Sequence, residues 1–281
     1  MKRISILALL ALFVVSCQKS SIAPTSDSLT NANDESSVAT KSRSHYLTSH
    51  PWIYSKYYLN YVDPSHPGTL VYKRGRNNNS LNLDKAQATF NEDGTVDEID
   101  ENGTHISGTW QFLDDAQTIL RVTNYTGVYT ATILELNNNN FSWHYTDVDG
   151  VERYAEETSP ERFYTKLLTA HTWMYKKYYT GYVDSSDLGT LVYKRGGVHN
   201  TLDLNNDFTT FYPGGTVDEN YNGTHISGTW SFIDNTATVF QVVNNTGVYT
   251  ATIVELDNRH FSWHYTDVYG VERYGVQIPT P

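Results

Sequence analysis

The sequence is poor in the residue types on which several common kinds of site depend. Its 281 residues include one cysteine, which excludes intramolecular disulfides and cysteine-based zinc sites. Lys and Arg number 20 against 31 Asp and Glu, and the formal charge of −11 argues against a broad nucleic-acid-binding surface. Charged residues make up only 18%, which excludes a coiled coil or a disordered polyelectrolyte.

Motifs of common enzyme classes are also missing from the sequence. It has no Gly-x-Ser-x-Gly elbow, no phosphate-binding loop and no dinucleotide fingerprint. Long helical periodicity is missing as well, and only residues 159–170, which start Ser-Pro and carry a short apolar stripe, predict a helix. We therefore expect no catalytic residues, no metal and no cofactor.

The first residues have the pattern of an export signal. Lys2 and Arg3 precede an apolar run at 4–15 that is too short to span a bilayer. Residues 14–17 (VVSC) resemble the lipobox of bacterial lipoproteins, and the only cysteine, Cys17, stands at its cleavage position. The resemblance implies a signal peptide at 1–16 and acylation of Cys17, with several acyl chains for stable anchoring. The alternative is an ordinary signal peptide with an incidental cysteine.

Residues 17–44 are rich in Ser, Thr, Asn and Ala, which predicts a disordered tether after the lipidated cysteine. The three residues after Cys17 include no Asp or Glu, which favours the periplasmic face of the outer membrane over the cell surface. Asp27-Ser28-Leu29 resembles a short O-glycosylation site, so Ser28 is a candidate for modification.

The rest of the chain consists of two copies of one sequence repeat, with a period of about 120 residues. Residues 69–75 (TLVYKRG) recur at 190–196, and residues 103–110 (GTHISGTW) recur at 223–230. Since the period is too long for a solenoid repeat, each copy is expected to be a domain, at 45–158 and 159–281.

Strand signals in the first copy recur about every ten residues. Asp-Gly and Asn-Gly pairs separate several of them and favour tight hairpins between antiparallel strands. The fold class is therefore all-β, with two tandem small up-and-down barrels, because closure removes exposed strand edges. The expected strands are 52–58, 70–74, 80–84, 88–91, 95–98, 106–112, 118–123, 127–136, 141–147 and 151–154.

A family resemblance supports the barrel. Trp52 in the first strand, FNEDGT at 90–95, GTWQF at 108–112 and YTATILEL at 129–136 resemble the lipocalin-like domains of bacterial lipoproteins. The second copy keeps this order with Trp173, 211–216, 228–232 and 249–256. The resemblance implies a small apolar ligand or no ligand, and no catalytic residues.

Aromatic residues are the strongest candidates for a binding site. Strand alternation predicts that they face the barrel interior, where they either fill a core or line a pocket. A recurring basic pair, expected near an opening, could meet the polar head of a ligand. The candidates are Trp52, Trp110, Trp143, Tyr145, Lys73 and Arg74, with their counterparts Trp173, Trp230, Trp263, Tyr265, Lys194 and Arg195.

Other polar residues suggest chemistry less strongly. His50, His105 and His144 lie on three separate elements, so structural roles are favoured over a metal site. Asp97 and Glu98 are adjacent in a strand and should point to opposite faces, unlike the facing carboxylates of a glycosidase. Residues 147–152 faintly resemble a calcium loop, and a hairpin is the favoured interpretation.

The sequence thus favours a lipid-anchored, non-catalytic envelope protein that binds a small apolar, aromatic or sugar ligand in each barrel. We expect a monomer whose partners are the membrane, through its lipid, and a small molecule, and not nucleic acid. The alternatives are a structural or partner-binding lipoprotein with solid barrels and, less favoured, an envelope hydrolase. A barrel cavity of about 300 Å³ or more would favour ligand binding over the solid-barrel alternative.

Overall fold

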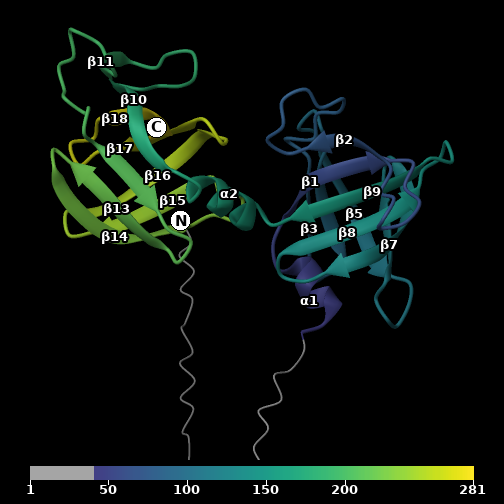
Figure 1. The fold of residues 1–281 in the computed structure, drawn as a ribbon. Helices are drawn as coiled ribbons and strands as arrows, with labels where there is room; N and C mark the ends of the chain where they lie inside the picture. Colours follow the sequence, from purple (N-terminus) through teal and green to yellow (C-terminus); the bar gives the residue numbers. More distant parts are fainter. Residues whose placement is uncertain (1–40) are drawn as a thin grey trace, which may run out of the picture. The chain divides into compact units, whose positions relative to one another are not determined.

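The computed structural model describes residues 41–281, which form two β-barrels in tandem (Figure 1). Each barrel is a ring of eight antiparallel strands that follows a short helix, which confirms the predicted all-β class. The predicted signal peptide, Cys17 and Ser28 lie outside the described residues. Among residues 41–281, no helix has the length and apolar character needed to cross a membrane.

The first repeat begins with helix α1 (Arg43–Thr48), in which the Ser42 side chain accepts a hydrogen bond from the His45 N–H as N-cap. Glycines with positive φ stand in the predicted turns, at +83° for Gly94 and +91° for Gly103. The strands are β1 (Trp52–Leu59), β2 (Thr69–Lys73), β3 (Gln87–Phe90), β4 (Thr95–Ile99), β5 (His105–Phe112), β6 (Ile119–Asn124), β7 (Gly127–Leu136), β8 (Asn140–Thr146) and β9 (Glu152–Thr158).

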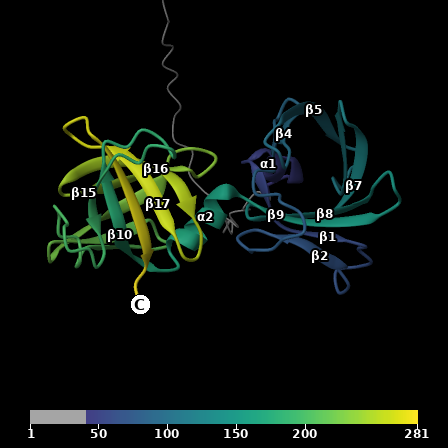
Figure 2. The ribbon, with the colours of Figure 1, turned by 90° about the horizontal axis from the view of Figure 1, so that it is seen from above.

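Strand β1 closes the ring. Along one edge it pairs with β9, and along the other its start pairs with β3, at Trp52 and Ile53. Its remaining half, from Lys56 to Leu59, pairs with β2, which is paired with no other strand of the described chain. Figure 2 shows β4, β5, β7, β8 and β9 curving around the interior of this repeat.

The second repeat has the same order. Helix α2 (Pro160–Leu168), N-capped by Ser159 with Pro160 in its first turn, lies within the range predicted to be helical. The strands are β10 (Thr172–Thr180), β11 (Thr190–Lys194), β12 (Phe208–Phe211), β13 (Thr216–Tyr221), β14 (Thr224–Phe232), β15 (Val239–Asn244), β16 (Gly247–Leu256), β17 (Phe261–Thr266) and β18 (Glu272–Pro279).

Each helix is attached to its barrel by a buried tryptophan. The Trp52 indole N–H donates to the Leu47 carbonyl at 2.9 Å, and that of Trp173 donates to the Leu168 carbonyl at 2.7 Å. Both tryptophans are completely buried, and Leu47 and Leu168 belong to the cores of their repeats. Each helix therefore lies at the end of its barrel where the first strand begins.

Two sequence expectations were wrong. Residues 80–84 are not a strand, because the Ser80 and Leu81 N–H groups both donate to the single carbonyl of Val71 and not to successive carbonyls of a neighbouring strand. Further along the same loop, the carbonyls of Leu83 and Asp84 accept from the Arg74 guanidinium instead of from a neighbouring strand. Helix α1 was not anticipated, and it begins within the predicted tether at 17–44.

Candidate functional site

The interior of the second barrel contains a cavity of about 540 Å³. Phe211, Phe240 and Phe261, all members of the core, line its inner part. The lining continues to Tyr221 at the end of β13 and to Thr246 in the turn after β15, at the barrel end opposite α2. The cavity therefore extends from the packed core to the end of the barrel that no helix covers.

A carboxylate lies inside each barrel, held by the same two donors. In the cavity, Glu219 accepts from the Tyr249 hydroxyl at 2.6 Å and from the Asn244 amide at 2.8 Å. Burial, and secondarily the negative charge of Glu219, raises the pKa of Tyr249, which keeps this phenol protonated as a donor. The first barrel repeats the arrangement with Glu98, which accepts from the hydroxyl of Tyr129 and the amide of Asn124.

The two interiors differ at the buried polar position beside the tryptophan of the eighth strand. In the first barrel, the indole N–H of Trp143 donates to Glu157 at 3.0 Å, and the second carboxyl oxygen of Glu157 has no partner among the described residues. In the second barrel, Trp263 donates to the Gln277 side-chain oxygen at 3.2 Å, and Gln277 Nε2 has no partner there. Gln277 lines the cavity.

Burial also determines the protonation of this position in the first barrel. Glu157 is 5% exposed, and its burial raises the pKa of its carboxyl to about 8. The negative charge of Glu98 acts in the same direction, while the Trp143 hydrogen bond and the Arg74 charge oppose the rise. Glu157 is therefore largely protonated at neutral pH, whereas Gln277 carries no charge at any pH.

Charged groups complete the lining of the second cavity. Asp207 is buried, its Oδ1 accepts the Asn222 N–H at 3.0 Å, and its Oδ2 has no partner in the described chain. Arg273 donates through Nη2 to Asp267 at 2.7 Å, near the barrel end opposite α2. Ala86 occupies the place of Asp207 in the first repeat, so this carboxylate is specific to the second.

The predicted aromatic residues divide into two groups. Trp263 and Tyr265 line the second cavity, whereas Trp173 and Trp230 do not. Trp173 donates to the Leu168 carbonyl, and Trp230 donates to the Tyr212 carbonyl at 3.1 Å. In the first repeat, Trp143 and Tyr145 lie beside each other on one strand. The indole N–H of Trp52 donates to a carbonyl of α1, and that of Trp110 donates to the Asn91 carbonyl.

The predicted basic pair is divided between solvent and the fold. Lys73 and Lys194 are exposed. Arg74 donates three hydrogen bonds to the carbonyls of Tyr54, Leu83 and Asp84, and Arg195 repeats this pattern. Neither Lys194 nor Arg195 lines the cavity of the second barrel. Arg74 and Arg195 therefore attach a loop to their barrels and do not offer a charge to a ligand.

Sequence reasoning missed the interior polar residues Glu219, Gln277 and Asp207. A signal for the first was present, because Glu98 and Glu219 stand two residues after the core valines Val96 and Val217 in their strands. The structure supports the expectation that Asp97 and Glu98 face opposite sides, since Asp97 accepts from Ser107 at the surface while Glu98 bonds inward.

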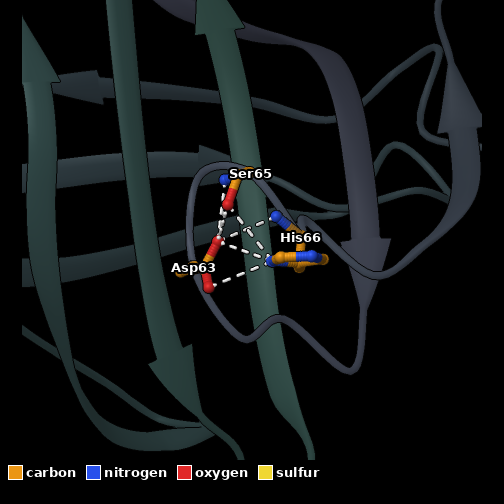
Figure 3. A network of polar contacts seen from close by, with 3 residues as sticks. All are labelled: Asp63, Ser65 and His66. Carbon is orange, nitrogen blue, oxygen red and sulfur yellow. Dashed lines mark hydrogen bonds and ion pairs between the residues drawn. The ribbon is translucent and has the colours of Figure 1, made fainter.

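A surface turn brings together the residue types of a hydrolase triad (Figure 3). Asp63 accepts from the Ser65 hydroxyl at 2.6 Å, and both Ser65 Oγ and Asp63 Oδ1 lie 3.1 Å from the same His66 nitrogen, Nδ1. A triad needs serine and aspartate on different ring nitrogens, so this arrangement is a turn and not a proton relay. Hydrogen bonds from Ser65 and then His66 lower the pKa of Asp63 to about 2.

Possible metal ligands also have simpler roles. His144 packs against the Tyr61 ring at 4.9 Å on the outside of the barrel, apart from His50, which bonds to backbone carbonyls. Asp147 accepts the N–H groups of Asp149 and Val151, which supports the hairpin interpretation of residues 147–152. Glu255, Asp257 and His260 bring ligand atoms within 4.8 Å of one another, but Asp257 also accepts the backbone N–H of His260 in a tight turn.

The chain matches no protein-family profile and no curated protein. Among solved structures it is similar to a crystal structure from Bacteroides fragilis NCTC 9343 described as a "putative outer membrane protein". The two sequences are 11% identical over 85% of this chain and 100% of that chain, with a TM-score of 0.20. A likeness this distant carries no argument about function.

Proposed function

We propose that the chain is a non-catalytic, lipid-anchored envelope protein that binds a small molecule inside its second barrel. The cavity of about 540 Å³ carries this proposal, because it lies within the range of small-molecule sites. Its lining is also typical of such sites, with aromatic walls and a few polar groups that could orient a ligand. The interior volume thus favours ligand binding over a solid barrel.

The cavity also suggests which end a ligand would enter. The end at α2 is filled by Leu168, Trp173 and the phenylalanines of the core. At the opposite end, Asp267 and Arg273 line the cavity at the margin of the ring. Entry at that end would need no rearrangement of the core.

Binding can be tested with protein purified from its own envelope. Native mass spectrometry should show a small molecule that remains bound to the chain. For that molecule, Trp263→Phe should weaken affinity at least fivefold, because Trp263 lines the cavity, whereas Trp173→Phe should leave it unchanged. Equal affinities for the wild type and a folded Trp263→Phe variant would reject the cavity as the site.

The proposed anchor is acylated Cys17, which would hold the protein at the periplasmic face of the outer membrane. Support comes from the lipobox-like residues 14–17 and from the uniqueness of this cysteine in the chain. We expect Cys17→Ser to release the protein from the membrane fraction, as judged by fractionation and immunoblotting. Ser28→Ala is the matched control and should remain attached, and continued attachment of Cys17→Ser would contradict the proposed anchor.

A further inference from the structure

We propose that the second barrel is selective for an uncharged, hydroxylated head group carried on an apolar chain or ring, such as a glycoside. This inference rests on the proposed function and specifies the class of ligand. Its evidence is the set of polar atoms left without partners in the cavity and the balance of charge along the cavity wall.

Two buried polar atoms at the cavity lack partners among residues 41–281, and they are of opposite kinds. Gln277 Nε2 is a donor, since the Trp263 hydrogen bond fixes the other amide atom as the acceptor oxygen. Asp207 Oδ2 is an acceptor. A buried polar group without a partner is costly, so a ligand that bonds to both atoms would be favoured. A hydroxyl group can donate and accept, whereas an ammonium only donates and a carboxylate only accepts.

The charge of the lining also disfavours an anion. Three carboxylates line the cavity, those of Asp207, Glu219 and Asp267, with Arg273 as the one cationic side chain among the lining residues. Arg273 already pairs with Asp267. A fatty acid or another anionic ligand would therefore meet two carboxylates without a free cation.

The rest of the lining explains the apolar part of the ligand. Leu202, Leu204 and Phe208 come from the loop before β12 and its first residue, and Phe240 and Phe261 come from the core. Trp263 and Tyr265 add adjacent rings with centroids 5.4 Å apart. An alkyl chain or aromatic group would bury apolar surface against these side chains, while the hydroxylated head reaches the polar atoms.

The first repeat supplies a natural reference for this specificity. Glu157 stands where Gln277 stands, against an equivalent tryptophan, so the fold accommodates either side chain there. Gln277→Glu exchanges the free amide donor for a carboxyl group. The test is run at pH 9, above the pKa of about 8 that burial gives to Glu157 at the matching position of the first barrel.

The test uses three probes that share one alkyl chain and differ in the head group: n-octyl β-D-glucoside, octylammonium and octanoate. Each is titrated into the full chain at pH 9, below its micelle-forming concentration, and binding is followed by tryptophan fluorescence. We expect the glucoside to bind at least tenfold more tightly than octanoate and several-fold more tightly than octylammonium.

In Gln277→Glu, the glucoside should lose at least tenfold in affinity while octylammonium gains. Glu157→Gln, the matched control in the other barrel, should leave all three affinities unchanged, and circular dichroism should show both variants folded. Preferred binding of octanoate or octylammonium by the wild type would overturn the inference and retain the proposed function. An unchanged glucoside affinity in Gln277→Glu, or a change in Glu157→Gln, would also overturn the inference. If none of the probes binds, the inference fails, while the proposed function still depends on the molecule that remains bound to the protein purified from its envelope.

Discussion

Glu157 and Gln277 show how a change from a carboxyl to an amide group alters a buried position that the two repeats share. Both accept a hydrogen bond from a tryptophan, and both are at most 5% exposed. The glutamine is neutral at every pH. The glutamate must hold a proton to remain neutral, because burial in a medium of low polarity disfavours its charged form.

This difference predicts a pH dependence of stability in the first barrel. Unfolded Glu157 ionises near its ordinary pKa of 4.5, whereas in the folded protein its pKa is about 8. Between these values the folded state holds a proton that the unfolded state has lost. The free energy of unfolding should therefore fall as pH rises through this window, by up to about 1.4 kcal/mol per pH unit, and level off above pH 8.

Denaturant titrations from pH 5 to pH 9 would measure this contribution. Glu157→Gln should lose it, so the variant should be less sensitive to pH than the wild type across the window. Gln277→Glu is the matched control and should add a contribution of the same sign. Parallel pH profiles for Glu157→Gln and the wild type would show that Glu157 already ionises at its ordinary pKa in the folded protein.

At the scale of the element, the Arg74 side chain takes the place of a neighbouring strand as the hydrogen-bond donor to a loop. The loop between β2 and β3 runs beside the barrel without pairing, and Arg74 satisfies the carbonyls of Leu83 and Asp84 instead. The Tyr72 hydroxyl also donates to Asp84 at 2.8 Å. The sequence predicted a strand at 80–84, because the pattern of residues does not reveal which group will donate to these carbonyls.

Arg74→Ala should therefore destabilise the first barrel by about 1–3 kcal/mol, since it leaves the carbonyls of Leu83 and Asp84 in this loop, and of Tyr54 in β1, without their charged donor. The neighbouring residue provides the control. The side chain of Lys73 is exposed, and Lys73→Ala should change stability by less than about 0.5 kcal/mol. Chemical denaturation of both variants would measure the difference, and equal effects would contradict the proposed role of Arg74.

Elements with strong local signals could be predicted from the sequence. The strand at 127–136 and the hairpins at Gly94 and Gly103 have the expected bounds or backbone conformations. Helix α2 was expected because Ser159 and Pro160 begin it. Helix α1 has only six residues and one core side chain, Leu47, so its apolar periodicity is too short to detect.

At the scale of the whole molecule, the duplication made the architecture predictable but not the interior. Strand alternation places Trp263 and Tyr265 inward, as expected. Whether inward side chains leave a cavity depends on how closely they pack, to within the volume of a few methyl groups. Positions where the repeats differ, such as Asp207 against Ala86 and Phe208 against Gln87, lie at the wall of the second cavity. Their effect on volume is visible only once neighbours in space are known.

Each repeat also has what an independent domain requires. The core of the second repeat draws only on residues of that repeat, from Leu168 to Trp263, and β10 pairs with β18 to close its ring. A fragment of residues 159–281 keeps the N-cap of α2 and every strand of this barrel. We expect it to fold alone, with a β-type circular dichroism spectrum and one cooperative thermal transition.

The corresponding first-repeat fragment should begin at Lys41 rather than at residue 45. Ser42 caps α1, whose Leu47 carbonyl accepts from the buried Trp52. A start at residue 45 would remove the cap and the first two residues of a six-residue helix, so we expect a lower melting temperature for 45–158 than for 41–158. Equal melting temperatures would show that the start of α1 and its cap do not stabilise the first barrel. If neither 41–158 nor 159–281 folds in isolation, the two copies depend on each other and form a single cooperative unit.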